Sequence, residues 1–327
     1  MAKKRILSGM RPTGPLHLGH LHGALANWKR MQDEYECFFF IADWHALTTD
    51  YEKTGGIAQN IREMMMDWLA VGLSPDKCTM FVQSHIKEHA ELYLLLGMLT
   101  PVPWLERNPT YKEQIVQLAD KDLSTYGFLG YPVLQAADII MYKADGVPVG
   151  IDQVPHVELT REIVRRFNYL YGQVFVEPQS ILTETPKILG LDRRKMSKSY
   201  QNGISLSDSP ETVRKRVGEM ITDPQRMRKS DPGDPDVCNV FSFHKMYSPV
   251  ETVDEVNREC RVAGIGCVAC KKKMAENLAA FLAPIYENRR DLAENPAIVD
   301  EIIAAGDAKA RETARATMAQ AREAMHI

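Results

Sequence analysis

Short apolar runs and amphipathic segments alternate along the first half of the chain, which is the hydrophobic pattern of a protein built from strands and helices in turn. Strand-like apolar runs occupy residues 5–9, 37–43, 79–83 and 147–150. Apolar positions recur at helical spacing over about 21–31, 57–71, 88–98 and 155–171. Because strand and helix alternate without an internal repeat, the pattern predicts an α/β fold with a doubly wound, Rossmann-like parallel sheet.

The alternation is broken in two places. Prolines and a polar run interrupt it over residues 101–130, which we interpret as an insertion that forms either a substrate lid or an oligomer surface. Beyond about residue 206 the pattern is helical, and it ends in a helix over about 307–325. We therefore predict a sheet domain over 1–205 and an all-helical domain over 206–327.

Composition and charge are those of an ordinary globular protein. The chain has 327 residues, of which 45% are hydrophobic and 25% charged, and a formal net charge of −3, which excludes a strongly basic surface over the whole molecule. No apolar run reaches the roughly 18 residues of a membrane span, and the basic start leads into a strand rather than a secretion signal. Six cysteines in such a chain argue against a disulfide framework. We expect a cytoplasmic protein with no membrane partner.

The turn after the first strand carries candidate phosphate chemistry. Residues 11–20 read Arg-Pro-Thr-Gly-Pro-Leu-His-Leu-Gly-His and lead into a helix, and α/β folds present such strand–helix turns to phosphate. Gly19 leaves room for a ligand, and the imidazoles of His17 and His20 can donate hydrogen bonds to anionic oxygens. Taken alone, the same turn is equally an ordinary connection with solvated histidines.

Polar groups also collect on the otherwise apolar segment 131–142, which predicts a helix with Pro132 in its first turn. Asp138 lies one helical turn from Gln135 and two from Tyr131. A carboxylate in such a setting is costly to bury without a partner. Asp138 therefore has either a structural hydrogen bond or a ligand that offers an N–H group or a cation.

Two further stretches supply candidate ligand contacts. Residues 150–153, Gly-Ile-Asp-Gln, place small and polar groups between a strand and a helix, and His45 follows the strand at 37–43 in the same way. In residues 193–199, Arg-Arg-Lys-Met-Ser-Lys-Ser, cations are mixed with small hydroxyl groups. That composition suits polyphosphate, and it equally suits a solvated basic loop.

The opening turn and the basic loop together resemble a known pair of signatures. Residues 12–20, Pro-x-Gly-x-Leu-His-Leu-Gly-His, and residues 195–199, Lys-Met-Ser-Lys-Ser, resemble the HIGH and KMSKS motifs of class I aminoacyl-tRNA synthetases. The second is a complete match, and the first differs only by Leu for Ile. Between them, residues 131–139 and 147–161 look like those of tryptophanyl-tRNA synthetases. The resemblance covers essentially the whole chain.

This resemblance implies that the protein activates L-tryptophan with ATP, with Mg²⁺ on the phosphate oxygens, and transfers it to the 3′ end of tRNA(Trp). The helical domain would bind the anticodon, and the enzyme would be a homodimer. Four catalytic side chains would stabilise phosphate charge, namely His17, His20, Lys195 and Lys198. ATP would contact Arg11, Pro12, Thr13, Gly19, His20, Gly150, Ile151, Asp152, Ile188, Lys195, Met196, Ser197, Lys198 and Ser199.

The resemblance also gives Asp138 a ligand. An indole offers one N–H donor and no acceptor, and the carboxylate would accept it. The amino acid would be surrounded by Leu7, His45, Tyr131, Gln135, Asp138 and Gln153. Leu7 stands where many bacterial members have an aromatic residue, and Arg11 where they often have Gln. A tyrosine-specific sister family presents a carboxylate to a phenol, and the residues around Asp138 resemble the tryptophan branch.

Four of the six cysteines gather late in the chain, at Cys238, Cys260, Cys267 and Cys270. Four thiolates in a cytoplasmic protein suit either zinc or an iron–sulfur cluster, and free thiols are a third interpretation. A subset of bacterial tryptophanyl-tRNA synthetases carries a similar set, with one more residue in the first interval, associated with a [4Fe–4S] cluster. The resemblance favours the cluster over Zn²⁺. Three lysines follow directly and can face RNA phosphates.

Two other classes of function remain open. An adenylyl-transferring enzyme of the same superfold would use the His-x-Gly-His turn without tRNA, but it needs neither the complete basic loop nor so large a helical domain. A non-enzymatic RNA-binding relative would be expected to have lost the motif histidines or lysines, which this chain retains.

Overall fold

A five-stranded parallel sheet forms the centre of the computed structural model, which describes residues 3–117, 122–183, 188–198 and 200–327. The strand order is β3-β2-β1-β4-β5, so the order reverses between β1 and β4. The strands are β1 (Arg5–Met10), β2 (Glu36–Ile41), β3 (Cys78–Val82), β4 (Gly146–Val149) and β5 (Gln179–Leu182). The predicted doubly wound α/β fold is confirmed, and the short edge strand β5 adds to the strands predicted.

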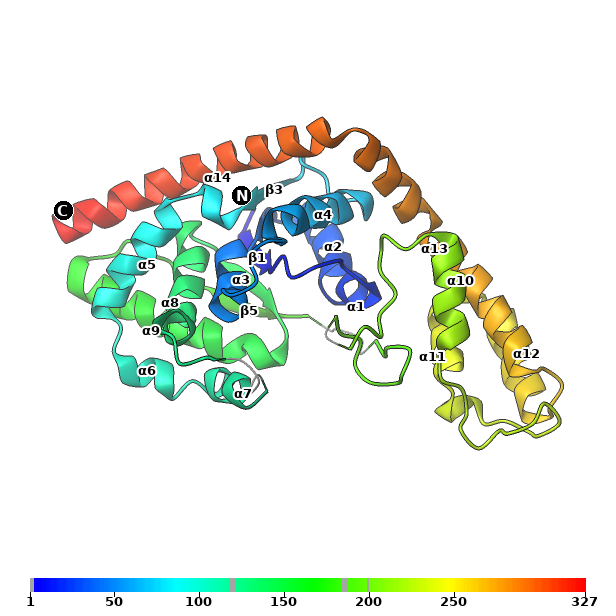
Figure 1. Cartoon of the computed structure of the whole chain (residues 1–327). Helices are drawn as coiled ribbons and strands as arrows, with labels where there is room; N and C mark the ends of the chain where they lie inside the picture. Colours follow the sequence, from blue (N-terminus) through cyan, green and yellow to red (C-terminus); the bar gives the residue numbers. More distant parts are fainter. Residues whose placement is uncertain (1–2, 118–121, 184–187, 199) are drawn as a thin grey trace.

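Strand β2 separates two hydrophobic cores. Phe39 and Ile41 point into one of them, while Phe38 and Phe40 point into the other. This alternation explains why the segment is apolar throughout, because a strand covered on both faces has no solvent-facing positions. Figure 1 shows helices on both sides of the sheet.

Helices pack against both cores, and the last helix contributes to both, with Val299 and Ile303 in the first and Ala310 and Ala314 in the second. The first core includes residues of α2 (Ala26–Glu34), α4 (Ile57–Ala70), α10 (Pro210–Glu219), α11 (Asn239–Tyr247), α12 (Val250–Arg261) and α13 (Cys267–Glu294). The second includes residues of α5 (Glu88–Leu99), α6 (Val102–Glu106), α8 (Tyr126–Met141), α9 (Val154–Tyr171) and α14 (Pro296–Met325). None of the helices in the described residues is long and apolar enough to cross a membrane.

The helix predicted after the opening turn consists of three pieces. These are α1 (Leu18–His20), a π-helical turn η1 (Leu21–Leu25) and α2. A π turn adds a residue to the helical turn and is frequent at functional sites. Here it carries His22, whose Nε2 lies 2.8 Å from the hydroxyl of Tyr247 on α11. The π turn therefore links the opening segment to the C-terminal helices.

Pro132 does not begin a helix, contrary to the prediction. It lies inside α8, which starts at Tyr126 and is capped by Thr125, whose side chain accepts a backbone N–H of the first turn. The cap, rather than the proline, therefore sets the start of the helix. In its described part, the predicted insertion at 101–130 contains α6, α7 (Pro109–Gln117) and the first turn of α8.

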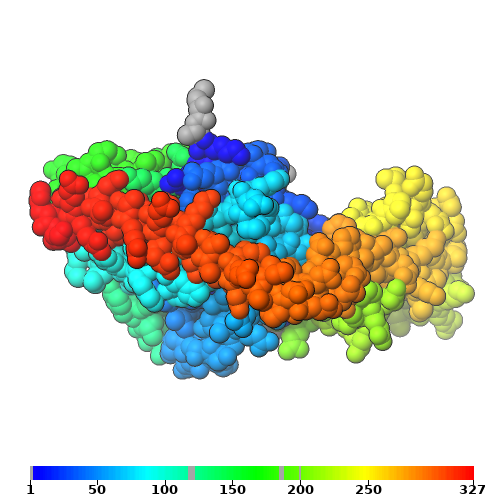
Figure 2. All heavy atoms as spheres, turned by 90° about the horizontal axis from the view of Figure 1, so that it is seen from above, coloured from blue at the N-terminus to red at the C-terminus, as the bar shows by residue number. Residues whose placement is uncertain are grey.

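The last helix, α14, begins at Pro296 and is thus longer than predicted. Figures 1 and 2 show it, at the red end of the colour scale, running along the outside of the molecule, where it packs against β3 and α5. At Gly306 the two backbones nearly touch, because a Cβ there would lie 1.7 Å from the carbonyl oxygen of Met80. The division at 205/206 stays a prediction, and α14 packs on the sheet that the other segment forms.

Replacing Gly306 by Ala is expected to destabilise the protein by about 2–3 kcal/mol, because the added methyl group meets the rigid backbone of β3. The matched control is Gly218→Ala on α10, where nothing lies within 4 Å of the added atom. There the higher helix propensity of Ala is expected to add up to about 1 kcal/mol. Thermal denaturation of both variants measures the difference, and equal stability would contradict the close packing of α14 on β3.

Candidate active site

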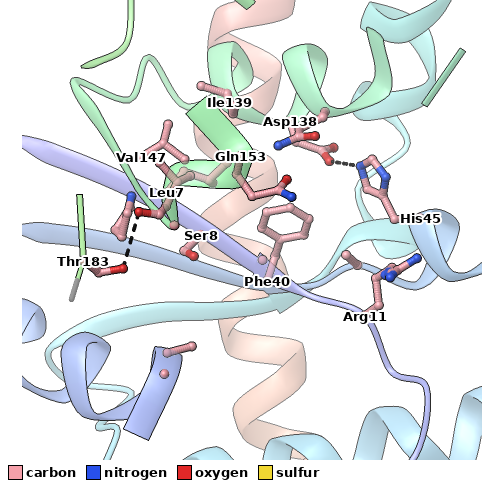
Figure 3. Close-up of a pocket in the computed structure, with 18 of the residues that line it drawn as sticks. Leu7, Ser8, Arg11, Phe40, His45, Asp138, Ile139, Val147, Gln153 and Thr183 are labelled. Atoms are coloured by element: carbon pink, nitrogen blue, oxygen red, sulfur yellow. Dashed lines mark hydrogen bonds and ion pairs between the residues drawn. The ribbon is translucent and has the colours of Figure 1, made fainter. Parts of the chain in front are cut away.

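A cavity of about 500 Å³ opens at the carboxyl ends of β1, β2 and β4, beside the reversal of strand order between β1 and β4. Open α/β sheets bind their ligands at such a switch point. Figure 3 shows Asp138 of α8 bonded to His45 of α3 (Asp43–Asp50) at one side of the cavity, with Phe40 and Gln153 in the same space.

The two histidines of the opening turn are held by backbone groups. The Nδ1 of His17 accepts the N–H of Gly19 at 3.1 Å, and the Nδ1 of His20 accepts the N–H of His17 at 3.1 Å. A neutral imidazole has one donor and one acceptor nitrogen, so both neutral rings carry their proton on Nε2. A side chain at Gly19 would come within 2.9 Å of the His17 ring, which is why a glycine stands there.

Burial keeps both imidazoles neutral. It lowers the pKa of His17 to about 4, and the charge of Lys198 adds to the effect. Burial also lowers the pKa of His20 to about 3, followed by the influence of His17 and Lys198. At neutral pH the two rings therefore offer uncharged Nε2–H donors, which can hydrogen-bond an anionic oxygen but supply no positive charge.

Backbone pairing brings the basic loop to the opening turn. The N–H of Leu18 donates to the carbonyl of Ile204 at 3.1 Å, and the N–H of Leu206 donates to the carbonyl of Leu16 at 2.9 Å. The segment that follows the loop is thus joined to the turn as a short antiparallel pair. Two motifs that are distant in the sequence become neighbours through these bonds.

Lys198 lies directly on the turn. Its Nζ donates to the carbonyl oxygen of Gly14 at 2.7 Å and lies 3.4 Å from Oγ1 of Thr13. Burial lowers the pKa of its ammonium group to about 8, the Asp67 carboxylate raises it, and the Arg11 charge lowers it further. Lys198 therefore retains most of its positive charge at neutral pH, next to the histidine donors.

Asp138 is almost fully buried and has three internal donors. Its Oδ2 lies 2.9 Å from Nε2 of His45, and its Oδ1 lies 2.6 Å from Nδ1 of His89. The amide of Gln83 donates to both oxygens, at 2.9 and 2.8 Å. A carboxylate has about four acceptor positions, and these three donors make four hydrogen bonds to it, so a ligand in the cavity that Asp138 lines meets a carboxylate already held by the protein.

The donors decide the charge of Asp138. Burial raises its pKa, but the hydrogen bond from His45 and the charge and hydrogen bond of His89 together outweigh burial, so the pKa lies below its usual value. The carboxylate is therefore ionised inside an apolar core. The structural alternative predicted for Asp138 has support from these internal hydrogen bonds, and the ligand alternative has support from its place in the cavity lining.

The structure brings together the residues predicted to surround the amino acid and some of those predicted for ATP. Predicted residues that line the cavity are Leu7, Arg11, Gly19, His20, His45, Tyr131, Gln135, Asp138, Gly150 and Gln153. Predicted residues outside the lining are Pro12, Thr13, His17, Ile151, Asp152, Ile188, Lys195, Met196, Ser197 and Lys198. Ile151 is 76% exposed, whereas Ile188 and Met196 belong to the first core. Ser199 lies outside the described residues.

Sequence reasoning found His45 but missed Gln83 and His89, which also hold Asp138, as well as Tyr142 and the ring of Phe40. Gln83 follows β3 directly, so its place at a strand end was a usable signal. His89 and Tyr142 lie in apolar helical surroundings and gave none. Phe40 enters the cavity because Gly9 has no side chain, since a Cβ there would lie 2.4 Å from the Phe40 ring.

The four late cysteines are free thiols that influence one another. Burial raises the pKa of Cys270 to about 12, and the charges of Cys238, Cys260 and Cys267 add to it. A guanidinium nitrogen of Arg226 lies 3.8 Å from the Cys260 sulfur. Within the described ranges, no group of three or more His, Cys, Asp or Glu side chains is arranged to hold a metal ion.

Comparison with known proteins identifies the class. The family model of class I tRNA synthetases for tryptophan and tyrosine matches residues 2–283, and the chain belongs to this family. Its branch is that of the tryptophan–tRNA ligases. It is 54% identical to the tryptophan–tRNA ligase of Thermotoga maritima, over 99% of both chains. It is 47% identical to that of Aquifex aeolicus, over 99% of this chain and 100% of the relative.

A solved structure gives the same result. The tryptophanyl-tRNA synthetase of Campylobacter jejuni, complexed with ADP and tryptophan, superposes with a TM-score of 0.91 at 33% sequence identity. The match covers 99% of this chain and 100% of that chain. The arrangement of sheet and C-terminal helices is therefore that of the family.

The lowered pKa values of His17 and His20 predict that neither ring takes up a proton between about pH 5 and 8. NMR signals of their ring protons, assigned with the variants His17→Asn and His20→Asn, should stay constant over that range. His85 is the internal control, because its hydrogen bond to Asp307 raises its pKa and its signals should shift. A titration of His17 or His20 beside that of His85 would contradict their burial as neutral rings.

Proposed function

We propose that this cavity binds ATP over the opening turn and L-tryptophan against Asp138. The chain is a tryptophan–tRNA ligase, which forms tryptophanyl-adenylate and pyrophosphate from L-tryptophan and ATP and then transfers tryptophan to the 3′ end of tRNA(Trp). The observation that carries the residue assignments is the polarity of the site. Neutral N–H donors and a lysine lie at the opening turn, and an ionised carboxylate lies in the lining of the cavity.

ATP is proposed to place its phosphates beside His17, His20 and Lys198. The two Nε2–H groups donate to phosphate oxygens, and the ammonium group of Lys198 supplies the positive charge that the neutral rings lack. Lys195 is exposed on the same loop and is proposed to reach the leaving pyrophosphate. The ribose and adenine are proposed to lie toward Gly150, which lines the cavity.

The activation step needs no nucleophile from the protein. The tryptophan carboxylate attacks the α-phosphorus, the bond from that phosphorus to the bridging oxygen breaks, and pyrophosphate leaves. The side chains contribute by aligning the two substrates and by stabilising the charge that develops on the phosphates. Mg²⁺ is proposed to enter with ATP, on its phosphate oxygens.

Tryptophan is proposed to donate its indole N–H to the Asp138 carboxylate, which lines the cavity. An amino acid that presents a lone pair instead of that donor faces an ionised oxygen, and sites built to hydrogen-bond a distinctive group reject analogues without it by roughly 10⁴–10⁵ in a related case. Leu7 and Phe40 supply apolar contact, while Tyr131 and Gln135 lie on the same helix as Asp138.

Purified protein with ATP and Mg²⁺ is expected to exchange labelled pyrophosphate into ATP only when L-tryptophan is present. Lys198→Met is expected to slow this exchange about 100-fold, because charge stabilisation of the phosphates is lost, and to leave tryptophan binding nearly unchanged. The matched control is Lys309→Met, the same substitution at an exposed lysine of α14. Exchange supported by tyrosine, or by no amino acid, would contradict the amino-acid assignment, and a Lys198→Met enzyme of normal rate would contradict the phosphate contact.

We further propose that Cys238, Cys260, Cys267 and Cys270 bind a [4Fe–4S] cluster, with Zn²⁺ as the alternative. Their mutual influence on pKa supports this, because it requires the four thiols to lie near one another. Thiolate sulfur is the ligand that both groups prefer. A bound cluster would join the start of α13, which carries Cys267 and Cys270, to Cys260 of α12 and to Cys238 just before α11. It would thereby cross-link these three helices.

Protein purified without oxygen is expected to be brown, with broad absorbance in the visible and about four irons per chain. The variant Cys267→Ser is expected to lose the colour, since one of the four ligands is gone, whereas Cys78→Ser, in the buried strand β3, should keep it. Colourless protein with one zinc per chain would contradict the [4Fe–4S] cluster and support Zn²⁺ as the bound group.

The remaining proposals concern partners and location. A homodimer is supported by apolar residues exposed on α5, where Leu94 and Met98 are one turn apart and 58% and 75% exposed. Tyr126 of α8 is exposed beside them, since its hydroxyl lies close to Gly97. Exposed apolar patches of this kind mark protein interfaces.

The segment 206–327 is proposed to bind the tRNA anticodon. The protein is proposed to act in the cytoplasm.

A further inference from the structure

A second set of buried side chains holds Asp138 from outside the lining of the cavity. His89 of α5 is 0% exposed, and both of its ring nitrogens are engaged. Nδ1 lies 2.6 Å from Oδ1 of Asp138, and Nε2 lies 2.8 Å from the hydroxyl of Tyr142. Tyr142, at the end of α8, is also 0% exposed. The proposed activation chemistry uses neither residue.

One hydrogen bond of this set has a fixed direction. An ionised carboxylate only accepts, so Nδ1 of His89 donates to Asp138. The other ring nitrogen, Nε2, is held by its contact with the Tyr142 hydroxyl. Tyr142 therefore holds the His89 ring in the orientation that points Nδ1 at Asp138.

Aromatic packing fixes both rings in place. The centre of the His89 ring lies 6.3 Å from that of Phe40 and 6.1 Å from that of Phe81. The Tyr142 ring lies 4.8 Å from Phe38 and 5.1 Å from Phe81. Side chains packed at this density keep one rotamer. An Asp138 oxygen bonded to His89 is thus held in one orientation beside the cavity that Asp138 lines.

We propose that His89 and Tyr142 are positioning residues for amino-acid specificity, which hold the Asp138 carboxylate so that it selects a ring bearing an N–H group. This inference rests on the proposed contact between Asp138 and the indole N–H. A ligand with sulfur in place of the N–H is rejected because the sulfur lone pairs face the fixed, ionised oxygen. If the carboxylate is free to turn, it turns away from the sulfur and the rejection weakens.

The test compares L-tryptophan with its isostere in which sulfur replaces the ring N–H, and measures kcat/KM for each in pyrophosphate exchange. The wild-type ratio is expected to favour tryptophan strongly. Tyr142→Phe is expected to reduce that ratio about tenfold through loss of one buried hydrogen bond. His89→Leu should reduce it further, and His89→Asn, which keeps an N–H donor near the position of Nδ1, should restore part of it.

The matched control is Tyr247→Phe. It also removes a buried hydroxyl that bonds a histidine ring, here His22 at 2.8 Å, but it lies outside the Asp138 set and should leave the ratio unchanged. If His89→Leu does not fold, Tyr142→Phe and His89→Asn still decide the question. Equal losses for both substrates, with an unchanged ratio, would overturn the positioning role alone. A wild-type ratio near one would instead contradict the Asp138–indole contact, and this inference with it.

Discussion

An ionised carboxylate stays inside an apolar core only when donors surround it, and the burial of Asp138 governs how the carboxyl edge of the sheet is assembled. The donors come from three separate elements: His45 of α3, His89 of α5, and Gln83 of the turn η2 (Gln83–His85) after β3. All three must reach one carboxylate on α8. The ends of β2 and β3 are thereby fixed relative to that helix, and the carboxylate that they hold lines the cavity.

A helix from the far end of the chain supports this edge from behind. Asp307 of α14 accepts the N–H of Val82 at 3.0 Å and lies 2.5 Å from Nδ1 of His85. These two residues flank Gln83, so the donor to Asp138 stands between two contacts with α14. Gly306 permits the approach, because its backbone meets that of β3 without a side chain between them. The packing of α14 on the sheet therefore helps to hold the residues around the cavity in place.

Local patterns gave the strands, the opening turn and the basic loop, because each depends on residues that are adjacent in the sequence. Asp138 was recognisable as a polar residue on an apolar helix, but His89 was not, since a buried histidine has the same local pattern whether or not it serves a site. The pairing of Leu18 with Ile204 depends on contacts between distant segments, and no periodicity records it. The prediction that Pro132 lies in the first turn of a helix was wrong for a related reason, because the capping residue upstream decides where α8 begins.

The positive charge of Lys198, beside the opening turn, also depends on the C-terminal helices. Asp67 of α4 accepts the N–H of Leu16 at 3.4 Å and pairs with Arg289 of α13 at 3.1 Å. Burial raises the pKa of Asp67 to about 7, while the charge of Arg289 and the bond from Leu16 oppose that rise. The charge of Asp67 in turn raises the pKa of Lys198. Because the charge of Arg289 favours ionised Asp67, and ionised Asp67 favours the ammonium form of Lys198, the contact from α13 supports the positive charge beside the opening turn.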